Sequence, residues 1–127
     1  MVRLIKISDW ATKNVITLNK EDTIHKAIML MDKHDIGVIP VVEENVPVGI
    51  ITERDILRRV VVKEIDAKHT PVAKVMTKNP ICIDADTSLL EVARLMSKNN
   101  FRRLLVIKDK KLAGIITEKD VIRMMSA

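Results

Sequence analysis

The feature that most constrains this sequence is an internal duplication with a period of 65 residues. Displacing the chain against itself by that distance aligns residues 10–62 with residues 75–127 without a gap, and fifteen of the aligned pairs are identical. The longest matching phrases are GIITERD at 49–55 and GIITEKD at 114–120. An ungapped register of this length indicates that one structural unit occurs twice, so any site should also occur in two related copies.

Each copy predicts the same order of elements, which is strand, helix, strand, strand, helix. Thr23 and Ser88 are the expected N-caps of the first helix in each copy, because each precedes a run of apolar residues at helical spacing. Those runs are Ile24, Ala27, Ile28 and Met31 in the first copy and Leu89, Val92, Ala93 and Met96 in the second. The predicted strands are 15–18, 36–42 and 46–51, then 80–83, 101–107 and 111–116. The predicted closing helices are 53–62 and 118–125.

The pattern places the chain in the α/β (α+β) class, as two tandem β-α-β-β-α units covering residues 1–64 and 65–127. With 127 residues the chain is about one domain, and either unit alone is too small to bury its apolar sheet face well. We therefore expect the halves to pack sheet to sheet about a pseudo-twofold axis. The connecting segment KEIDAKHTPVAKVM is a linker, and Thr70 before Pro71 predicts a short helical turn near its end.

The composition favours a folded, cytoplasmic chain without a membrane span. Hydrophobic residues make up 47% and charged residues 31% of the sequence, which is ordinary for a globular protein. No apolar stretch approaches the roughly 20 residues of a membrane helix, and the first residues lack the apolar centre of a signal peptide. The single cysteine, Cys82, lies in the apolar run PICI and is expected to be a buried, unreactive thiol.

Catalytic and metal chemistry have little support in the sequence. The three histidines, His25, His34 and His69, show no spacing typical of a metal site, and one cysteine does not make a zinc set. The only glycines are at positions 37, 49 and 114, so neither a Walker loop nor a GxGxxG motif is present. We predict no catalytic residues, no metal and no enzymatic activity.

The repeated turn has a structural and a functional interpretation. Thr52 ends an apolar strand and can cap the helix that follows, with Asp55 at the third helical position, which is typical of a capping box. Alternatively, the amides and hydroxyl at this helix start can hold a phosphate, and the carboxylate one turn later can accept both hydroxyls of a ribose. The two interpretations are compatible, and they apply equally to Thr117 and Asp120.

Basic residues leave a further alternative open. The formal net charge is +5, which favours anionic partners without choosing among phosphates, nucleotides and nucleic acid. Arg102 and Arg103 open a predicted strand, where alternation should direct one side chain inward and the other outward. A nucleic-acid surface would require several other basic residues to gather on one face: Arg58, Arg59, Lys63, Lys108 and Lys110.

With these elements in place, the sequence closely resembles a tandem pair of cystathionine-β-synthase (CBS) domains, an arrangement called a Bateman module. The stretches that carry the resemblance in the first copy are TKNVITLNKEDTIHKAIMLM, IGVIPVV and VGIITERD. Those in the second copy are VMTKNPICIDADTSLLEVARLM, FRRLLVI and AGIITEKD. Together they cover nearly the whole chain and recur in register.

The resemblance implies a regulatory module, not an enzyme, that binds an adenosine ligand in two clefts between the paired sheets. The ligand would be AMP, ADP or ATP, or else S-adenosylmethionine or NAD. In the first cleft the implied residues are Thr52, Arg54 and Asp55, with Ile81 and Cys82 beside the base and Arg102 and Arg103 on the phosphates. In the second they are Thr117, Lys119 and Asp120, with Ile16 and Thr17 flanking the base and Gly37, Val38 and Ile39 as the facing wall.

Two departures from the family pattern bear on the ranking of these clefts. Leu105 stands where the family often has proline, which the first copy keeps in IPVV. The first copy has Gly37 and Val38 where the second has two arginines. We therefore predict that the cleft with Asp55 binds more tightly.

The same resemblance predicts a homodimer formed through helices and an effector protein supplied in trans. Two alternatives from other classes stay open, namely a nucleic-acid-binding basic protein and a structural dimerisation adaptor whose clefts are empty.

Overall fold

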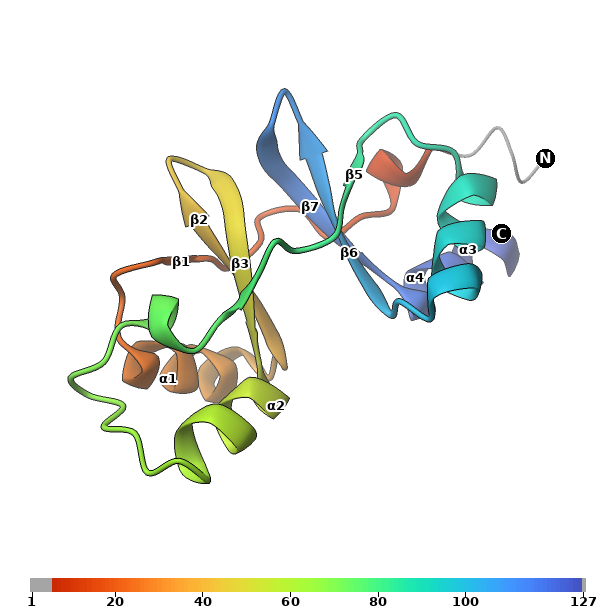
Figure 1. Ribbon diagram of the computed structural model, residues 1–127. Coiled ribbons are helices and arrows are strands. Elements are labelled where there is room, and N and C mark those ends of the chain that lie inside the picture. The colour runs from red at the N-terminus through yellow and green to blue at the C-terminus, as the bar shows by residue number, and fades with distance from the viewer. Residues whose placement is uncertain (1–5, 127) are drawn as a thin grey trace. The chain divides into compact units, whose positions relative to one another are not determined.

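The computed structural model describes residues 6–126, and within them the chain divides into two compact units. One unit is the continuous segment 16–80, and the other joins residues 6–15 to residues 81–126. We call them the central unit and the terminal unit. Each combines a small β-sheet with two principal helices, so the mixed α+β class predicted from the sequence is confirmed (Figure 1). The predicted packing of one sheet on the other stays a prediction.

The central unit contains a four-stranded sheet in the order β1-β2-β3-β4. Its strands are β1 (Leu18–Asn19), β2 (Val38–Glu43), β3 (Val46–Thr52) and β4 (Thr77–Lys78). β1 runs parallel to β2, and the remaining pairs are antiparallel. Helix α1 (Ile24–His34) follows β1, and α2 (Glu53–Asp55) continues into a π-helix, η3 (Ile56–Val61). A 3₁₀ turn, η4 (Val72–Lys74), precedes β4, where the sequence predicted a helical turn.

The terminal unit repeats this plan with three strands. These are β5 (Cys82–Asp84), β6 (Arg103–Lys108) and β7 (Lys111–Thr117), in the order β5-β6-β7. Helices α3 (Leu89–Asn99) and α4 (Glu118–Ser126) are the counterparts of α1 and α2, and a 3₁₀ turn, η2 (Ile7–Asp9), lies near the beginning of the chain. Two elements, η2 and β4, fall where no strand or helix was predicted. The closing helix of the central unit lies within the predicted range 53–62, but most of it is π-helical.

Apolar residues of each unit form their own core cluster. In the central unit Ile24 and Ala27 of α1 pack with Ile39 and Ile51 of the sheet, all with no exposed surface. In the terminal unit Leu89 and Ile116 occupy the corresponding places. Because the predicted apolar helix faces lie in these cores, the helical spacing read from the sequence identified the buried side of α1 and α3.

The helix caps follow the sequence closely. The Thr23 hydroxyl accepts a hydrogen bond from the backbone N–H of Lys26 at 3.1 Å, and the Ser88 hydroxyl accepts one from Glu91 at 3.2 Å. Such caps stabilise a helix by about 1 kcal/mol each.

The first strand of each copy was predicted too early in the sequence. The predictions were 15–18 and 80–83, and the strands are Leu18–Asn19 and Cys82–Asp84.

Each unit borrows a short segment from the other sequence repeat. Thr77, directly after the linker, pairs with Ile50 of β3, although Thr77 belongs to the second repeat. Correspondingly, Thr12 of the first repeat forms a bridge with Ile115 of β7. The segments before β1 and before β5 are therefore exchanged between the copies, and the compact units do not end where the 65-residue repeat ends.

The hairpins in both units turn through two residues with positive φ. Glu44 and Asn45 have φ of 51° and 65°, and Asp109 and Lys110 have φ of 52° and 68°. Two consecutive positive φ values are typical of the type I′ turn, which matches the twist of the flanking strands. Within residues 6–126, no helix is long and apolar enough to cross a membrane.

Candidate nucleotide site at two related turns

Residues 49–55, which we call the Asp55 turn, form a complete capping box where β3 ends. The Asp55 N–H donates to the Thr52 hydroxyl at 3.1 Å, and the Thr52 N–H donates to Asp55 Oδ2 at 3.0 Å. This arrangement satisfies two amides at the start of the helix, where backbone donors otherwise lack partners. The structural interpretation of the repeated motif is therefore confirmed in this copy.

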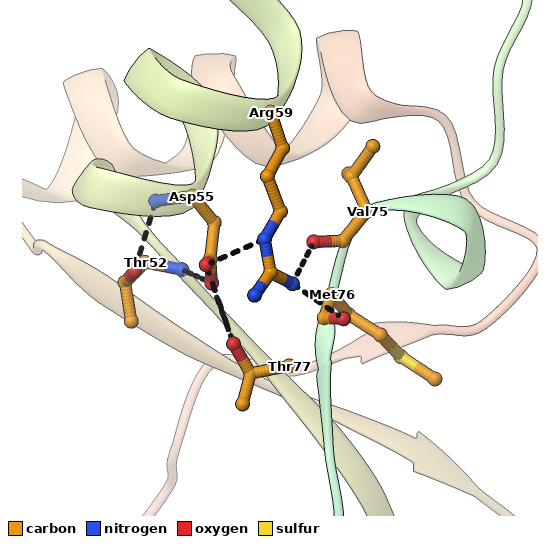
Figure 2. Close-up of polar contacts among 6 residues, drawn as sticks. All are labelled: Thr52, Asp55, Arg59, Val75, Met76 and Thr77. Carbon is orange, nitrogen blue, oxygen red and sulfur yellow. Dashed lines mark hydrogen bonds and ion pairs between the residues drawn. The ribbon is translucent and has the colours of Figure 1, made fainter.

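The Asp55 carboxylate has three further contacts within the central unit (Figure 2). The Thr77 hydroxyl lies 3.2 Å from Oδ1 and 3.3 Å from Oδ2, and Arg59 Nε lies 3.6 Å from Oδ1. The same guanidinium donates through Nη1 to the carbonyls of Val75 at 3.0 Å and Met76 at 3.1 Å. Asp55 is buried, with only 6% of its surface exposed, so its charge is balanced by contacts inside the protein rather than by water.

Residues 114–120, the Asp120 turn, form the same capping contacts with less around them. The Asp120 N–H donates to the Thr117 hydroxyl at 3.3 Å, while the Thr117 N–H and hydroxyl donate to Asp120 Oδ2 at 2.9 and 3.0 Å. Among residues 6–126, no group donates to Asp120 Oδ1, and Thr12, the counterpart of Thr77, makes no side-chain bond to it. Asp120 is half-buried. Oδ1 of Asp120 therefore has no hydrogen-bond donor within the described residues.

The difference between the turns originates one helical turn later. Arg59 aligns with Met124, which is completely buried in the core of the terminal unit. In the central unit the next residue, Val60, is buried in the core instead, with 4% of its surface exposed. The helix adopts the π form over Ile56–Val61. The bond from the Val62 N–H to the Leu57 carbonyl, at 3.0 Å, spans five residues as a π-helix requires. A charged side chain is costly in an apolar core, so Arg59 lies half-exposed beside Asp55 instead.

The strands adjacent to each turn bring other predicted residues to it. Val38 pairs directly with Thr52, and the Glu53 N–H donates to the carbonyl of Gly37 at 3.1 Å. Ile39 is the next residue of β2 and pairs with Ile51. The structure thus places Gly37, Val38 and Ile39 beside the Asp55 turn, within the central unit.

The matching positions beside the Asp120 turn carry the two arginines. Arg103 pairs with Thr117, and the carbonyl of Arg102 accepts the Glu118 N–H at 2.9 Å. Both side chains are exposed, and neither has an ion-pair partner in the described part of the chain. The expectation that one would point inward was wrong, because Arg102 precedes the strand and the buried residues Leu104, Leu105 and Val106 interrupt the alternation.

The remaining predicted residues lie at strand starts or on helix surfaces. Ile16 and Thr17 directly precede β1, and both are half-buried. Ile81 precedes β5 and is 44% exposed, and Cys82 is half-buried, with burial raising the pKa of its thiol. A raised pKa keeps that thiol protonated at neutral pH, as expected for a structural cysteine. Arg54 and Lys119 are exposed on the first turn of their helices.

Each cleft implied by the family resemblance combines residues from both compact units. The predicted partners Asp55 and Arg102 belong to the central and terminal units respectively, as do Ile16 and Asp120. Those pairings stay predictions. Sequence reasoning did not single out Arg59 or Thr77 as site residues. The one signal for Arg59 was that a charge replaces Met124 of the other copy.

No cluster of histidine, cysteine and acidic side chains suited to a metal ion occurs among residues 6–126. The exposed His69 bonds to Asp66 at 2.8 Å, and this contact lowers the pKa of that carboxyl. The contact is local and solvent-facing.

Comparison with known proteins identifies the family of this doubled fold. The family model described as the CBS domain matches residues 7–62 and again residues 72–127, which together are most of the chain. The chain belongs to the CBS domain family. It carries two CBS domains, and each match begins with a segment that the structure assigns to the other compact unit.

Relatives of this CBS-domain pair are found among bacterial proteins. The CBS domain-containing protein YhcV of Bacillus subtilis is 35% identical over 91% of this chain and 81% of its own length. A protein with CBS domains from Burkholderia ambifaria MC40-6 is 34% identical, with a TM-score of 0.77 over 89% of this chain and 83% of that chain. Across the first curated relatives, the chain spans from 32% to 81% of their lengths.

One similar structure contains a nucleotide. CBSX2, solved in complex with AMP, is 25% identical and superimposes with a TM-score of 0.81 over 95% of this chain and 96% of that chain. A protein with this fold therefore accepts an adenine nucleotide.

Proposed function

We propose that this CBS-domain pair is a regulatory module that binds an adenosine nucleotide of the AMP, ADP or ATP class. The observation that carries the proposal is the Asp120 turn, where a carboxylate with one unengaged oxygen lies beside two unpaired arginines. A ribose diol donates two hydrogen bonds, which suits the carboxylate, and guanidinium groups suit phosphate. The AMP bound by CBSX2 supports the same ligand class.

The two turns have unequal surroundings for an anionic ligand. Arg102, Arg103 and Lys119 lie on or beside the Asp120 turn and are exposed. The Asp55 turn has the exposed Arg54, an Arg59 that is already paired with Asp55, and the uncharged Gly37 and Val38 beside it. Local charge therefore favours the Asp120 turn, the reverse of the ranking from sequence. S-adenosylmethionine and NAD carry the same ribose and adenine and compete as alternatives.

We also propose that the pair acts as a homodimer that reports ligand to an effector protein. The closing helices carry exposed apolar side chains: Leu57, Val61 and Val62 in the central unit, and Ile122 and Met125 on α4. Apolar side chains gathered on one element are typical of a protein interface, and a second copy presents the same surface.

Titration calorimetry with AMP, ADP, ATP, S-adenosylmethionine and NAD tests the proposal on the wild-type chain. We expect a 5′-phosphorylated adenosine to bind and GMP to bind at least about tenfold more weakly, which corresponds to about 1.4 kcal/mol. Sedimentation velocity on the same samples reports the dimer. No heat from any of the five ligands at millimolar concentration, with no rise in melting temperature, would exclude the nucleotide function.

The nucleic-acid alternative has weaker support. Of its five basic residues, Arg58, Arg59 and Lys63 belong to the central unit and the two lysines to the terminal unit. Arg59 is already engaged by Asp55 and by two backbone carbonyls. Retardation of a DNA or RNA duplex at low salt, with a steep loss of binding as salt rises, would support that alternative instead.

A further inference from the structure

We propose that Arg59 latches Asp55 and thereby keeps ligand from the Asp55 turn until the guanidinium is displaced. The inference rests on the proposed nucleotide function and adds to it a residue that sets the difference between the two turns. It predicts one ready site, at the Asp120 turn, and one closed site, at the Asp55 turn.

The acceptor capacity of Asp55 is largely used. A carboxylate offers about four lone-pair positions. On Asp55 these face the Thr52 N–H, the Thr77 hydroxyl and the Arg59 guanidinium, and only 9% of the side-chain surface is exposed. A ribose diol needs two well-placed acceptor positions on one face of the carboxylate. It therefore has to replace Arg59, Thr77 or both.

The guanidinium is held on two sides, which makes the latch specific to arginine. Nε faces the carboxylate at 3.6 Å, while Nη1 donates to the Val75 and Met76 carbonyls at 3.0 and 3.1 Å (Figure 2). The planar fork of arginine permits this bridging geometry, and the single ammonium of lysine does not reproduce it. The contact ties the closing helix to the exchanged segment that precedes β4.

The other copy of the turn shows the unlatched state. Met124 replaces Arg59 and is buried in the core, so no cation from the closing helix reaches Asp120. Among the described residues the Thr12 hydroxyl also makes no hydrogen bond to Asp120, whereas its counterpart Thr77 bonds Asp55. The same chain therefore contains the motif with and without the latch.

Calorimetric titration of AMP into Arg59→Gln tests the latch, with Arg58→Gln as the matched control. Arg58 lies on the same helix, is exposed, and its side chain makes no hydrogen bond or ion pair with the described residues. We expect wild type and Arg58→Gln to bind one AMP per chain and Arg59→Gln to bind two. If wild type already binds AMP weakly at a second site, the affinity of that site should be about tenfold higher in Arg59→Gln, which corresponds to about 1.4 kcal/mol.

Two further measurements separate the latch from a merely structural role of Arg59. The site gained in Arg59→Gln should bind AMP more tightly than 2′-deoxy-AMP, because Asp55 would accept both ribose hydroxyls. Arg59→Lys keeps the charge but loses the bridge, and it should give an intermediate gain, which provides the test if the glutamine variant fails to fold.

The possible results distinguish the latch from the nucleotide function. AMP binding by wild type with unchanged stoichiometry and affinity in both Arg59 variants overturns the latch and leaves the nucleotide function standing. A weaker second site in these variants also overturns it, since Arg59 would then assist the ligand. Absence of AMP binding in wild type and in both variants overturns both proposals.

Discussion

The Asp55 turn and the Asp120 turn have almost the same sequence but differently engaged carboxylates. In both, threonine caps the helix and aspartate completes the box. Only Asp55 is also held by an arginine and by a second threonine, and it is the more deeply buried of the two. A duplicated motif therefore keeps its capping role while its surroundings decide whether it remains open to a ligand.

The comparison separates two uses of one aspartate. The capping interaction depends on residues three positions apart and is present in both copies, where T-E-x-D starts a helix. Whether the second carboxylate oxygen, Oδ1, has a partner depends on the side chain at position 59 or 124 and on the threonine of the exchanged segment. Arg59 and Thr77 contact Asp55, whereas Met124 and Thr12 do not bond Asp120. Mutation of Asp120 should therefore reduce ligand affinity more than mutation of Asp55 does. Mutation of Asp55 should reduce the stability of the fold more than mutation of Asp120 does.

The largest expected effect is on nucleotide affinity. Asp120→Asn should weaken AMP binding about a hundredfold, or about 2.7 kcal/mol, because one acceptor of two charge-assisted hydrogen bonds is lost. The matched Asp55→Asn should change the affinity of the ready site less than about threefold. Calorimetry on the two variants compares them directly, and a larger loss from Asp55→Asn would restore the ranking predicted from sequence.

A smaller effect is expected on the free energy of unfolding, and here the mutation of Asp55 should cost more than that of Asp120. Asp55→Ala should lower the free energy of unfolding by about 2 kcal/mol, since it removes the capping contact with the Thr52 N–H and also leaves the Thr77 hydroxyl and the Arg59 guanidinium without their partner. Asp120→Ala should cost about 1 kcal/mol, the value of the cap alone. Urea denaturation followed by circular dichroism measures both, and equal costs would show that the contacts of Arg59 and Thr77 contribute nothing.

The smallest expected effect compares the two hairpin turns. Lys110 adopts a φ of 68°, which is unfavourable for a residue other than glycine, asparagine or aspartate. Lys110→Gly should therefore raise the stability of the terminal unit by about 0.5–1 kcal/mol. Trp10 lies in that unit and reports its unfolding by fluorescence.

The matched control for this turn is Asn45→Gly in the central unit. Asn45 has a φ of 65°, but asparagine tolerates this conformation, so the gain should be only a few tenths of a kcal/mol. A larger gain at position 45 than at position 110 would show that the two turns are not equivalent.

Several features of the fold were predictable because they depend on neighbouring residues. The caps at Thr23 and Ser88 and the apolar faces of α1 and α3 follow from spacings of three and four residues. The ends of β2, β3, β6 and β7 came within two residues of the prediction for the same reason. The short strands β1 and β5 were misplaced, because two or three residues carry little periodic signal.

Through the repeat, the sequence alone determined that one β-α-β-β-α unit occurs twice, each with a threonine and an aspartate at the start of its closing helix. Local spacing and hydrogen bonding are sufficient for that. Only the tertiary structure decided that the segments before β1 and β5 change places and that Arg59 turns away from the core toward Asp55. Both outcomes depend on contacts between residues distant in sequence. Burying the Arg59 guanidinium in an apolar core would be costly, whereas a carboxylate and two carbonyls stabilise it where it lies, and only the folded chain brings these groups together.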